Sequence, residues 1–248
     1  MSILRSVGGL STSRVLFQVA PSRSGIRRAN RSVNSLPGIH SCGVPVPRSG
    51  KPTRKRVLDA AYVLFRRKGY TRVSMDEIAA ATAVTKRTLY YHFRSKDELL
   101  AAVLEGQHDL ALAAFRTFGD KLSGSPVAIV DALFKDLAAW ADKPRWAGSG
   151  FTRLVVELAD LPGHPARLIA RRHKAVLERQ LGELFAKTGM RSPRARAREI
   201  YLLSEGAISM MLIHGDRKYA AAAAQAGKRL LQAGLRKRRP GAGKPYPT

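Results

Sequence analysis

Cysteine, acidic residues and long apolar runs are all scarce in this sequence, and each scarcity excludes a class of protein. Among 248 residues there is one cysteine, Cys42, which excludes an internal disulfide framework and a zinc site built from several cysteines. No uninterrupted run of about eighteen apolar residues occurs, so we expect no membrane-spanning helix. Only 18 acidic residues oppose 44 Lys and Arg, and the formal net charge of +26 favours a polyanionic partner, usually nucleic acid.

The segment that follows residue 50 has helical periodicity. In KPTRKRVLDAAYVLFRRKGY the apolar residues recur at helical spacing and form one stripe, which comprises Val57, Ala61, Leu64 and Phe65. Gly69 follows this stripe and can adopt the left-handed conformation that commonly ends a helix. The sequence therefore predicts a first helix that ends just before Gly69.

Capping residues divide the stretch SMDEIAAATAVTKRTLYYHF into two short helices. The Ser74 side chain is placed to accept from the amide of Glu77 while the Glu77 side chain reaches back, and Thr85 is placed to cap the next helix. The first of these helices ends at Thr82 and Ala83. A further capping box, SKDE at 95–98, begins a fourth helix. The spacing is that of a helix, a turn and a helix.

The third helix has two different faces. Its inner face is apolar and aromatic, with Leu89, Tyr90 and Phe93. Its outer face is polar and basic, with Arg87, Thr88, Tyr91 and His92. A short exposed helix that begins with Lys86, Arg87 and Thr88 is narrow enough to enter the major groove of DNA. Its first turn also carries hydrogen-bond donors for the edges of the bases. A basic solvated surface is the alternative interpretation, but the spacing, the net charge and the third capping signal favour DNA binding.

Residues 54–104 resemble the DNA-binding domain of the tetracycline-repressor (TetR) family of bacterial transcription regulators. The most specific matches are LYYHF at 89–93 and SKDEL at 95–99. The resemblance implies an all-α homodimeric repressor of about nine helices. We expect an extension at 1–50, a helix-turn-helix DNA-binding domain at 51–100, a helical regulatory and dimerisation domain at 101–235 and a basic tail at 236–248.

The same resemblance implies which residues contact DNA. The bases and the groove would be contacted by Lys86, Arg87, Thr88 and Tyr91, and the phosphates by Ser74, Thr85, His92 and Lys96. His92 has the alternative role of a hydrogen-bonded surface histidine. The family usually has Gly in the turn and early in the third helix, where this chain has Ala83 and Arg87. No operator sequence can therefore be borrowed from the family.

Both ends of the chain are basic and lack apolar periodicity. Residues 1–50 contain seven Arg and no acidic residue, and the stretch 236–244 adds five basic residues. We expect both ends to be disordered and outside the fold. Two origins fit residues 1–50, an organellar transit peptide or upstream sequence of a GC-rich bacterial gene read from too early a start, and the bacterial domain that follows favours the second.

Periodicity and helix-ending residues predict the helices beyond residue 94. The expected ranges are 95–118, stopped by Gly119, then 125–143, 151–160, 165–188, 192–214 and 217–234. The last two ranges combine small and apolar residues in a seam: Ile200, Leu203, Gly206, Ala207, Met210, Met211, Ala220 to Ala224, Gly227 and Leu231. We predict a homodimer through about 193–234, with an ordinary intrachain core as the alternative.

The middle helices are expected to enclose a cavity for an unknown small-molecule effector, as the resemblance implies. Candidate lining residues are His108, Phe115, Trp140, Trp146, Phe151 and Met210. No phosphate loop, HExxH or clustered Cys and His set occurs, so we expect no catalytic residues, no metal and no cofactor. The predicted function is a cytoplasmic, operator-binding regulator, most simply a ligand-released repressor. The alternative is a basic helical protein that binds DNA without sequence preference or ligand control.

Overall fold

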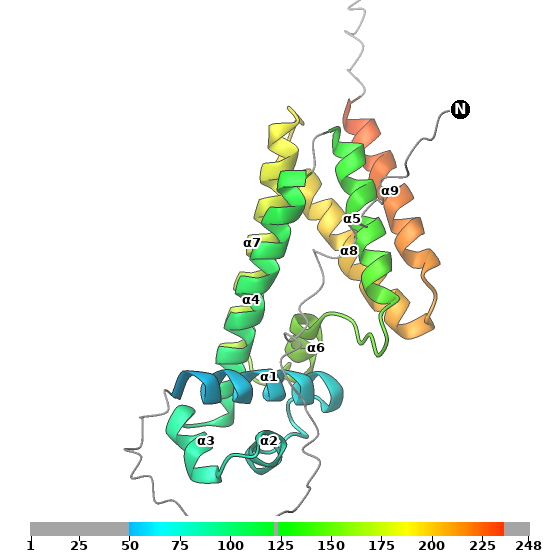
Figure 1. The fold of residues 1–248 in the computed structure, drawn as a ribbon. Coiled ribbons are helices and arrows are strands. Elements are labelled where there is room, and N and C mark those ends of the chain that lie inside the picture. Colours follow the sequence, from blue (N-terminus) through cyan, green and yellow to red (C-terminus); the bar gives the residue numbers. More distant parts are fainter. Residues whose placement is uncertain (1–49, 122–123, 236–248) are drawn as a thin grey trace, which may run out of the picture.

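The computed structural model describes residues 50–121 and 124–235, and the regular elements in these two ranges are all α-helices (Figure 1). They are α1 (Gly50–Lys68), α2 (Met75–Thr82), α3 (Lys86–His92), α4 (Lys96–Lys121), α5 (Pro126–Ala141), α6 (Gly150–Glu157), α7 (Pro165–Lys187), α8 (Pro193–His214) and α9 (Lys218–Leu235). Within these ranges no helix is both long and apolar enough to cross a membrane. The predicted all-α fold is confirmed, while the predictions for 1–49 and 236–248 fall outside the described residues.

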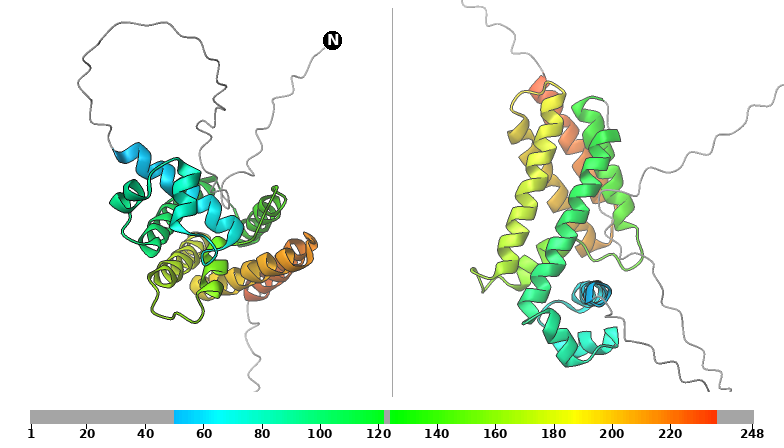
Figure 2. Two further views of the ribbon diagram at one scale, coloured as in Figure 1. Left: turned by 90° about the horizontal axis from the view of Figure 1, so that it is seen from below. Right: turned by 60° about the vertical axis from the view of Figure 1, so that its left-hand side comes forward.

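A small domain of α1, α2 and α3 lies at one end of the molecule, and α4 leads from it into a larger helical domain. In Figure 1, α1 crosses the lower ends of α4 and α7, and α2 and α3 lie beneath it. The right-hand view in Figure 2 shows α4 and α7 side by side, with α5 and α9 next to them. The small domain has its own core, in which Val57, Ala61, Ile78, Leu89 and Leu99 are fully buried.

The caps predicted from the sequence form the boundaries of α2 and α3. Ser74 accepts a hydrogen bond from the Glu77 amide at 3.1 Å, and Thr85 accepts one from the Thr88 amide at the same distance. These bonds satisfy amides that a helix leaves unpaired at its first turn. The predicted return bond to the Glu77 carboxylate is not made, and one oxygen of that carboxylate instead pairs with Lys68 at 2.5 Å.

The turn between α2 and α3 is left-handed at Ala83, whose φ and ψ are 51° and 41°. This conformation costs a residue with a Cβ about 1 kcal/mol relative to glycine. We therefore expect Ala83→Gly to raise the free energy of unfolding by about 1 kcal/mol, measured by urea denaturation. Ala81→Gly, an exposed change inside α2, is the matched control and should lower it, because glycine weakens a helix interior. Equal effects of the two changes would refute strain at Ala83.

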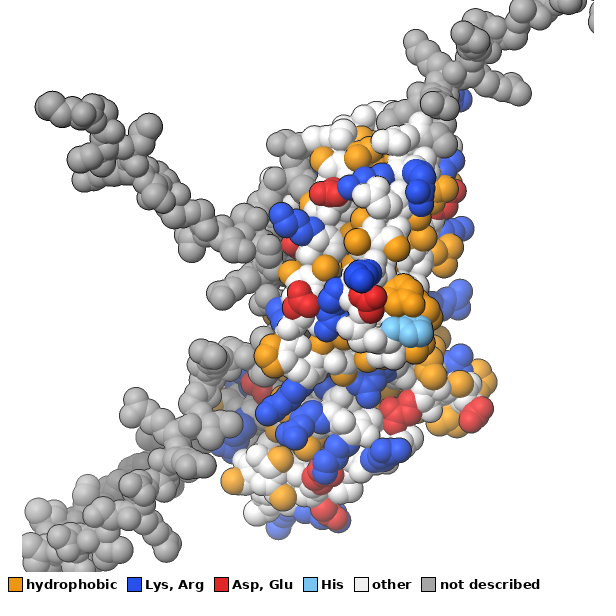
Figure 3. Space-filling model, turned by 90° about the vertical axis from the view of Figure 1, so that its right-hand side faces the viewer, with side chains coloured by type: hydrophobic (Ala, Val, Ile, Leu, Met, Phe, Trp, Pro, Cys, Tyr) orange, Lys and Arg blue, Asp and Glu red, His pale blue; other side chains and the backbone are white. Residues whose placement is uncertain are grey.

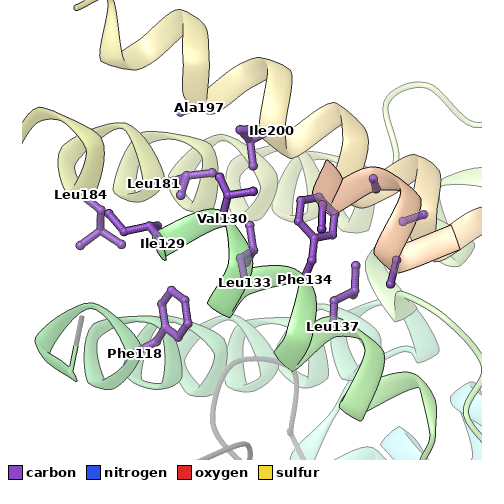
Figure 4. Packing of buried hydrophobic residues seen from close by; sticks show 14 of the residues in the cluster. Phe118, Ile129, Val130, Leu133, Phe134, Leu137, Leu181, Leu184, Ala197 and Ile200 are labelled. Carbon is purple, nitrogen blue, oxygen red and sulfur yellow. The ribbon is translucent and has the colours of Figure 1, made fainter. Parts of the chain in front are cut away.

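The large domain is organised around α5, which is apolar along most of its length. Its side chains Val130, Phe134 and Leu137 are at most 2% exposed. Figure 4 shows Val130 of α5 next to Leu181 of α7 and below Ile200 of α8, with Phe118 of α4 on the opposite side of α5. The core therefore joins five helices of the large domain, α4, α5, α7, α8 and α9.

Several predicted helix ends are wrong by a few residues, and Gly119 shows why. It lies inside α4, and a Cβ at this position would come within 3.0 Å of a methyl carbon of Leu184 on α7. Gly119 thus permits close approach of two helices and does not stop one. Similarly, α5 ends at Ala141, not Lys143, and α6 spans Gly150–Glu157, not 151–160. A glycine or proline marks a change of packing or geometry, which need not coincide with the last helical residue.

The seam predicted to join two subunits is for the most part an intrachain core. Ile200, Ala207 and Met211 of α8 pack with Ala220, Ala223, Ala224 and Leu231 of α9, and these side chains are at most 8% exposed. At Gly227 an added Cβ would be 2.8 Å from the Ile200 side chain, so α8 and α9 touch each other here. The alternative interpretation of this seam, an ordinary core, is therefore correct for these residues.

Candidate nucleic-acid interface and the cavity behind it

The outer face of α3 is exposed in the structure, as its periodicity predicts. Tyr91 is 84% exposed, Arg87 is exposed and Thr88 is half-buried. The inner side chains Leu89 and Phe93 are at most 1% exposed and fix α3 to α1, α2 and α4. Tyr90, expected to be partly structural, is 41% exposed. Figure 3 shows Lys and Arg side chains, with a few acidic ones, spread over the surface of the small domain.

Lys86 lies on the edge between α2 and α3. Its ammonium forms an ion pair with Asp76 of α2, at 2.9 Å from one carboxylate oxygen and 3.1 Å from the other. The hydrogen bond from Lys86 to the Asp76 side chain, with the charge of that carboxylate, raises the pKa of the Lys86 ammonium. Both side chains are exposed, so the pair contributes little to stability. It orients Lys86 at the start of α3, and base contact by Lys86 stays a prediction.

The predicted phosphate-binding residues occupy different environments. Ser74 and Thr85 are exposed and serve as helix caps, and Thr85 also bonds the Thr88 hydroxyl at 2.8 Å. His92 is half-buried between Tyr91 and Phe93, with ring centroids 5.3 Å and 6.5 Å away. These positions leave DNA contact by the three residues as a prediction.

Lys96 has a structural role that the sequence did not indicate. Its ammonium donates to the backbone carbonyls of Tyr70 and Val73, at 3.2 Å and 3.1 Å, and lies 4.3 Å from the centre of the Tyr70 ring. These contacts tie the start of α4 to the loop between α1 and α2. Two of the three N–H donors of the Lys96 ammonium are used in these bonds. One N–H donor therefore stays available for the phosphate contact predicted for Lys96.

The first turns of α1 add basic residues beside α3 that sequence reasoning missed. The Arg54 guanidinium carbon lies 5.0 Å from the centre of the Phe93 ring, and a Cβ at Gly50 would be 3.0 Å from Cε1 of His92. Lys51 and Arg54 are exposed. Because they lie about forty residues before the end of α3, only the folded structure brings them to this surface.

A capped helix, a left-handed turn and a short exposed helix with basic residues in its first turn define a helix-turn-helix protein. The family model described as "Bacterial regulatory proteins, tetR family" matches residues 57–103. Over 66 residues the chain is 41% identical to the HTH-type transcriptional regulator UidR of Escherichia coli, covering 27% of this chain and 34% of UidR. It is 38% identical over 86 residues to the regulator TtgW of Pseudomonas putida, covering 34% of this chain and 64% of TtgW.

Similarity to solved structures extends through the large domain. A TetR-family transcriptional regulator from Streptomyces coelicolor superposes with a TM-score of 0.64 and 25% identity, covering 75% of this chain and 95% of that one. A TetR regulator from Streptomyces avermitilis superposes with a TM-score of 0.59 and 28% identity, and the match covers 70% of this chain and 97% of that one. The segment of similar sequence thus spans about a third of UidR, whereas the similarity of fold covers 95% of the Streptomyces coelicolor regulator and 75% of this chain. The helix-turn-helix segment therefore matches the TetR family model, and the described chain has the fold of solved TetR-family regulators.

Helix α6 connects the large domain to the small one through Glu157. One carboxylate oxygen accepts from the Tyr70 amide at 3.0 Å, and the other accepts from the amide and hydroxyl of Thr71 at 2.7 Å and 2.6 Å. One turn earlier, Arg153 donates to the backbone carbonyl of Arg66 at 3.0 Å. The end of α1 and the loop before α2 are therefore held by two charged side chains of α6.

The Glu157 contacts make a testable contribution to the pH dependence of stability. Burial raises the pKa of this carboxyl, but hydrogen bonds from Thr71 and Tyr70 and the charge of Arg153 outweigh that effect, so the pKa lies below its usual range. A carboxyl whose pKa is lowered by folding stabilises the fold at pH values above its unfolded pKa. This stabilisation is lost as the pH falls through the folded pKa. We expect Glu157→Gln to lower the free energy of unfolding at pH 7 by about 1 kcal/mol, after allowance for solvent exposure.

The difference between wild type and Glu157→Gln should shrink as the pH falls from the usual pKa of a glutamate through the lowered pKa of Glu157, where the carboxylate becomes protonated. Urea denaturation at several pH values measures it. Glu183→Gln is the matched control, because Glu183 is 64% exposed and its contact with Arg179 is 3.8 Å long. A pH-independent loss for Glu157→Gln would show that its charge does not stabilise the fold.

A cavity of about 170 Å³ lies in the large domain and reaches the end of α1. Of the six predicted lining residues, Phe115, Trp140 and Phe151 line it, whereas His108, Trp146 and Met210 do not. His108 and Trp146 lie one layer behind: Nδ1 of His108 is 3.0 Å from Nδ1 of His173, and the Trp146 ring packs edge-on against Trp140. His173 lines the cavity and stacks on Phe151 with ring centroids 3.8 Å apart.

The polar end of the cavity was not predicted. Lys174 of α7 and Glu205 of α8 line it and form an ion pair of 2.5 Å. A signal existed for Lys174, which lies three residues before Leu177 and seven before Leu181 on the apolar stripe of its helix. A charged residue on a core-facing stripe indicates a paired or functional group. Its partner lies 31 residues away, and the sequence gives no sign of the pairing.

Proposed function

We propose that this protein is a homodimeric transcription regulator that reads a palindromic operator and releases it when a small molecule binds. The observation that carries the proposal is the exposed polar face of α3 in a capped helix-turn-helix. Arg87, Thr88 and Tyr91 face outward there, as reading of the major groove requires. A repressor in the bacterial cytoplasm, bound to the nucleoid through its operator, is the simplest form of this function.

Dimer formation is supported by a second stripe on α8, distinct from the one that packs inside the chain. Leu202 and Ile213 are 67% and 68% exposed, and Gly206 between them is also exposed. Their spacings of four and seven residues place them on one face. Ala221 and Ala222 of α9 are exposed small residues. A twofold pairing through these faces would present two α3 helices to two half-sites.

Ligand control is supported by the position of the cavity. Arg153 and Glu157 line it and also hold the end of α1 and the loop before α2. A ligand that displaces α6 would therefore disturb the contacts that hold the end of α1 and the loop before α2, and with them the position of the helix-turn-helix. We therefore propose that ligand binding acts through the contacts between α6 and the small domain.

The proposal is tested by selecting bound duplexes from random DNA with the full chain, then screening compounds for release of the selected site. Recovery of an inverted repeat with half-sites about one helical turn apart is expected. Binding that depends on salt but not on sequence would replace this proposal with that of a general DNA-binding protein. Sequence-specific binding that no compound reverses would remove ligand control alone.

A further inference from the structure

The cavity walls indicate the shape of what binds there. Most of the lining surface is apolar, and aromatic rings reach it from several helices, among them Phe65 of α1, Phe115 of α4, Trp140 of α5 and Phe151 of α6. Flat rings on several sides favour a flat apolar molecule, because aromatic groups pack by stacking and edge contacts. The volume of about 170 Å³ suits a molecule of about two fused rings.

Lys174 and Glu205 at the polar end neutralise each other. One oxygen of Glu205 accepts from Lys174 at 2.5 Å and the other accepts from the Thr152 hydroxyl at 2.9 Å. Lys174 also donates to the Ser149 hydroxyl at 3.3 Å, which uses two of its three N–H groups. Both side chains keep about a quarter of their surface exposed although they line the cavity. The pair thus offers a ligand one donor and no uncompensated charge.

An ionised ligand would be disfavoured at this end whichever sign it carried. A cation near the pair meets the Lys174 ammonium, an anion meets the Glu205 carboxylate, and either loses its hydration in an apolar cavity. His173 adds no charge at neutral pH, because burial, and then the charges of Lys174 and His108, lower the pKa of the His173 imidazole to about 3. The carboxylate of Glu157 is bound to Tyr70 and Thr71. An uncharged hydrogen-bond acceptor fits best.

We propose that the cavity binds an uncharged, flat aromatic molecule whose acceptor group, such as a carbonyl oxygen, receives a hydrogen bond from Lys174. The inference rests on the proposed ligand control only in identifying this molecule as the effector that releases DNA. Binding itself is a property of the cavity and can be measured without DNA.

Isothermal titration calorimetry of the full chain with four naphthalene probes tests the ligand class. The probes are 2-acetonaphthone, which is an uncharged acceptor, 2-naphthoate, which is an anion, 2-naphthylmethylamine, which is a cation at neutral pH, and naphthalene, which has no acceptor. We expect the ketone to bind about tenfold more tightly than each of the others. An anion or cation that binds as tightly as the ketone, equal binding of naphthalene, or no binding by any probe would overturn the proposal.

Two reciprocal substitutions assign the preference to the ion pair. Lys174→Met leaves the Glu205 carboxylate unpaired, so it should abolish the preference for the ketone over naphthalene and favour the amine. Glu205→Gln leaves the Lys174 ammonium unpaired and should favour naphthoate. Lys187→Met, an exposed change on the same helix, is the matched control and should leave all four affinities unchanged. Circular dichroism checks folding, and unchanged ratios in either folded variant would contradict the role of the pair.

A parallel assay of DNA release separates this inference from the proposed function. If the ketone binds most tightly but does not release the selected operator, the ligand class stands and ligand control fails. If the anion or the cation releases the operator more effectively than the ketone, ligand control stands and the ligand class fails.

Discussion

Replacing Arg87 by Ala should weaken binding to the selected operator by about 1–3 kcal/mol for each half-site, and relax base preference at one position. Arg87 is exposed in the first turn of α3, and its guanidinium has the fork of donors that pairs with the acceptor edge of guanine. Alanine keeps the helix and removes only those donors. Because a dimer reads two half-sites, the loss should appear twice in the complete operator.

Titrations of the selected operator and a scrambled duplex at several salt concentrations measure the effect of Arg87→Ala. The specific duplex should lose most of its advantage over the scrambled one. Arg171→Ala on α7 removes the same charge from an exposed site remote in sequence from α3 and is the matched control. If Arg87→Ala weakens both duplexes equally and lowers only the salt dependence, Arg87 contacts a phosphate and the proposed docking of α3 is wrong.

The helix-turn-helix was predictable because its determinants are local. Ser74 and Thr85 each bond an amide three residues ahead, and Leu89 and Phe93 lie one turn apart. A short stretch of sequence therefore contains both the helix boundaries and the division into inner and outer faces. At Ala83 the family's usual glycine is missing, and the structure keeps the left-handed turn nonetheless.

The contacts between domains and across the cavity were not predictable, because they join residues far apart in the chain. Glu157 bonds the Tyr70 amide across 87 positions, and Lys174 bonds Glu205 across 31. Periodicity shows that a side chain lies on a given face but not which helix covers that face. This ambiguity also explains Lys96, whose basic side chain suggested a phosphate contact but binds two carbonyls of its own domain.

The same ambiguity affects the dimer interface predicted in α8. Two stripes of this helix contain apolar residues, and the stripe with Ile200, Ala207 and Met211 is covered by the chain itself. The other stripe, with Leu202 and Ile213, is left exposed. An exposed apolar stripe on a helix at the end of a domain favours a subunit interface. The proposed dimer therefore combines Leu202 and Ile213, which were not in the seam predicted from the sequence, with Gly206, Ala221 and Ala222, which were.

Changing Leu202 and Ile213 together to Lys should convert the protein to a monomer at micromolar concentration. In a twofold interface each lysine would be buried against the apolar face of the other copy, and burial of these charges would cost more than the lost apolar contacts. The intrachain fold should be unaffected, because both side chains are more than half exposed. A monomer engages one half-site, so operator affinity should fall on the order of a hundredfold or more.

Sedimentation equilibrium measures the change in mass, and thermal denaturation followed by circular dichroism checks that the fold is kept. Leu168→Lys on α7 is the matched control, since Leu168 is 59% exposed and lies outside α8 and α9. It should leave both the mass and the operator affinity unchanged. If the double variant remains a dimer with wild-type operator affinity, the two subunits meet elsewhere. If it becomes a monomer that still binds the full operator as tightly as wild type, the operator is not read by a dimer.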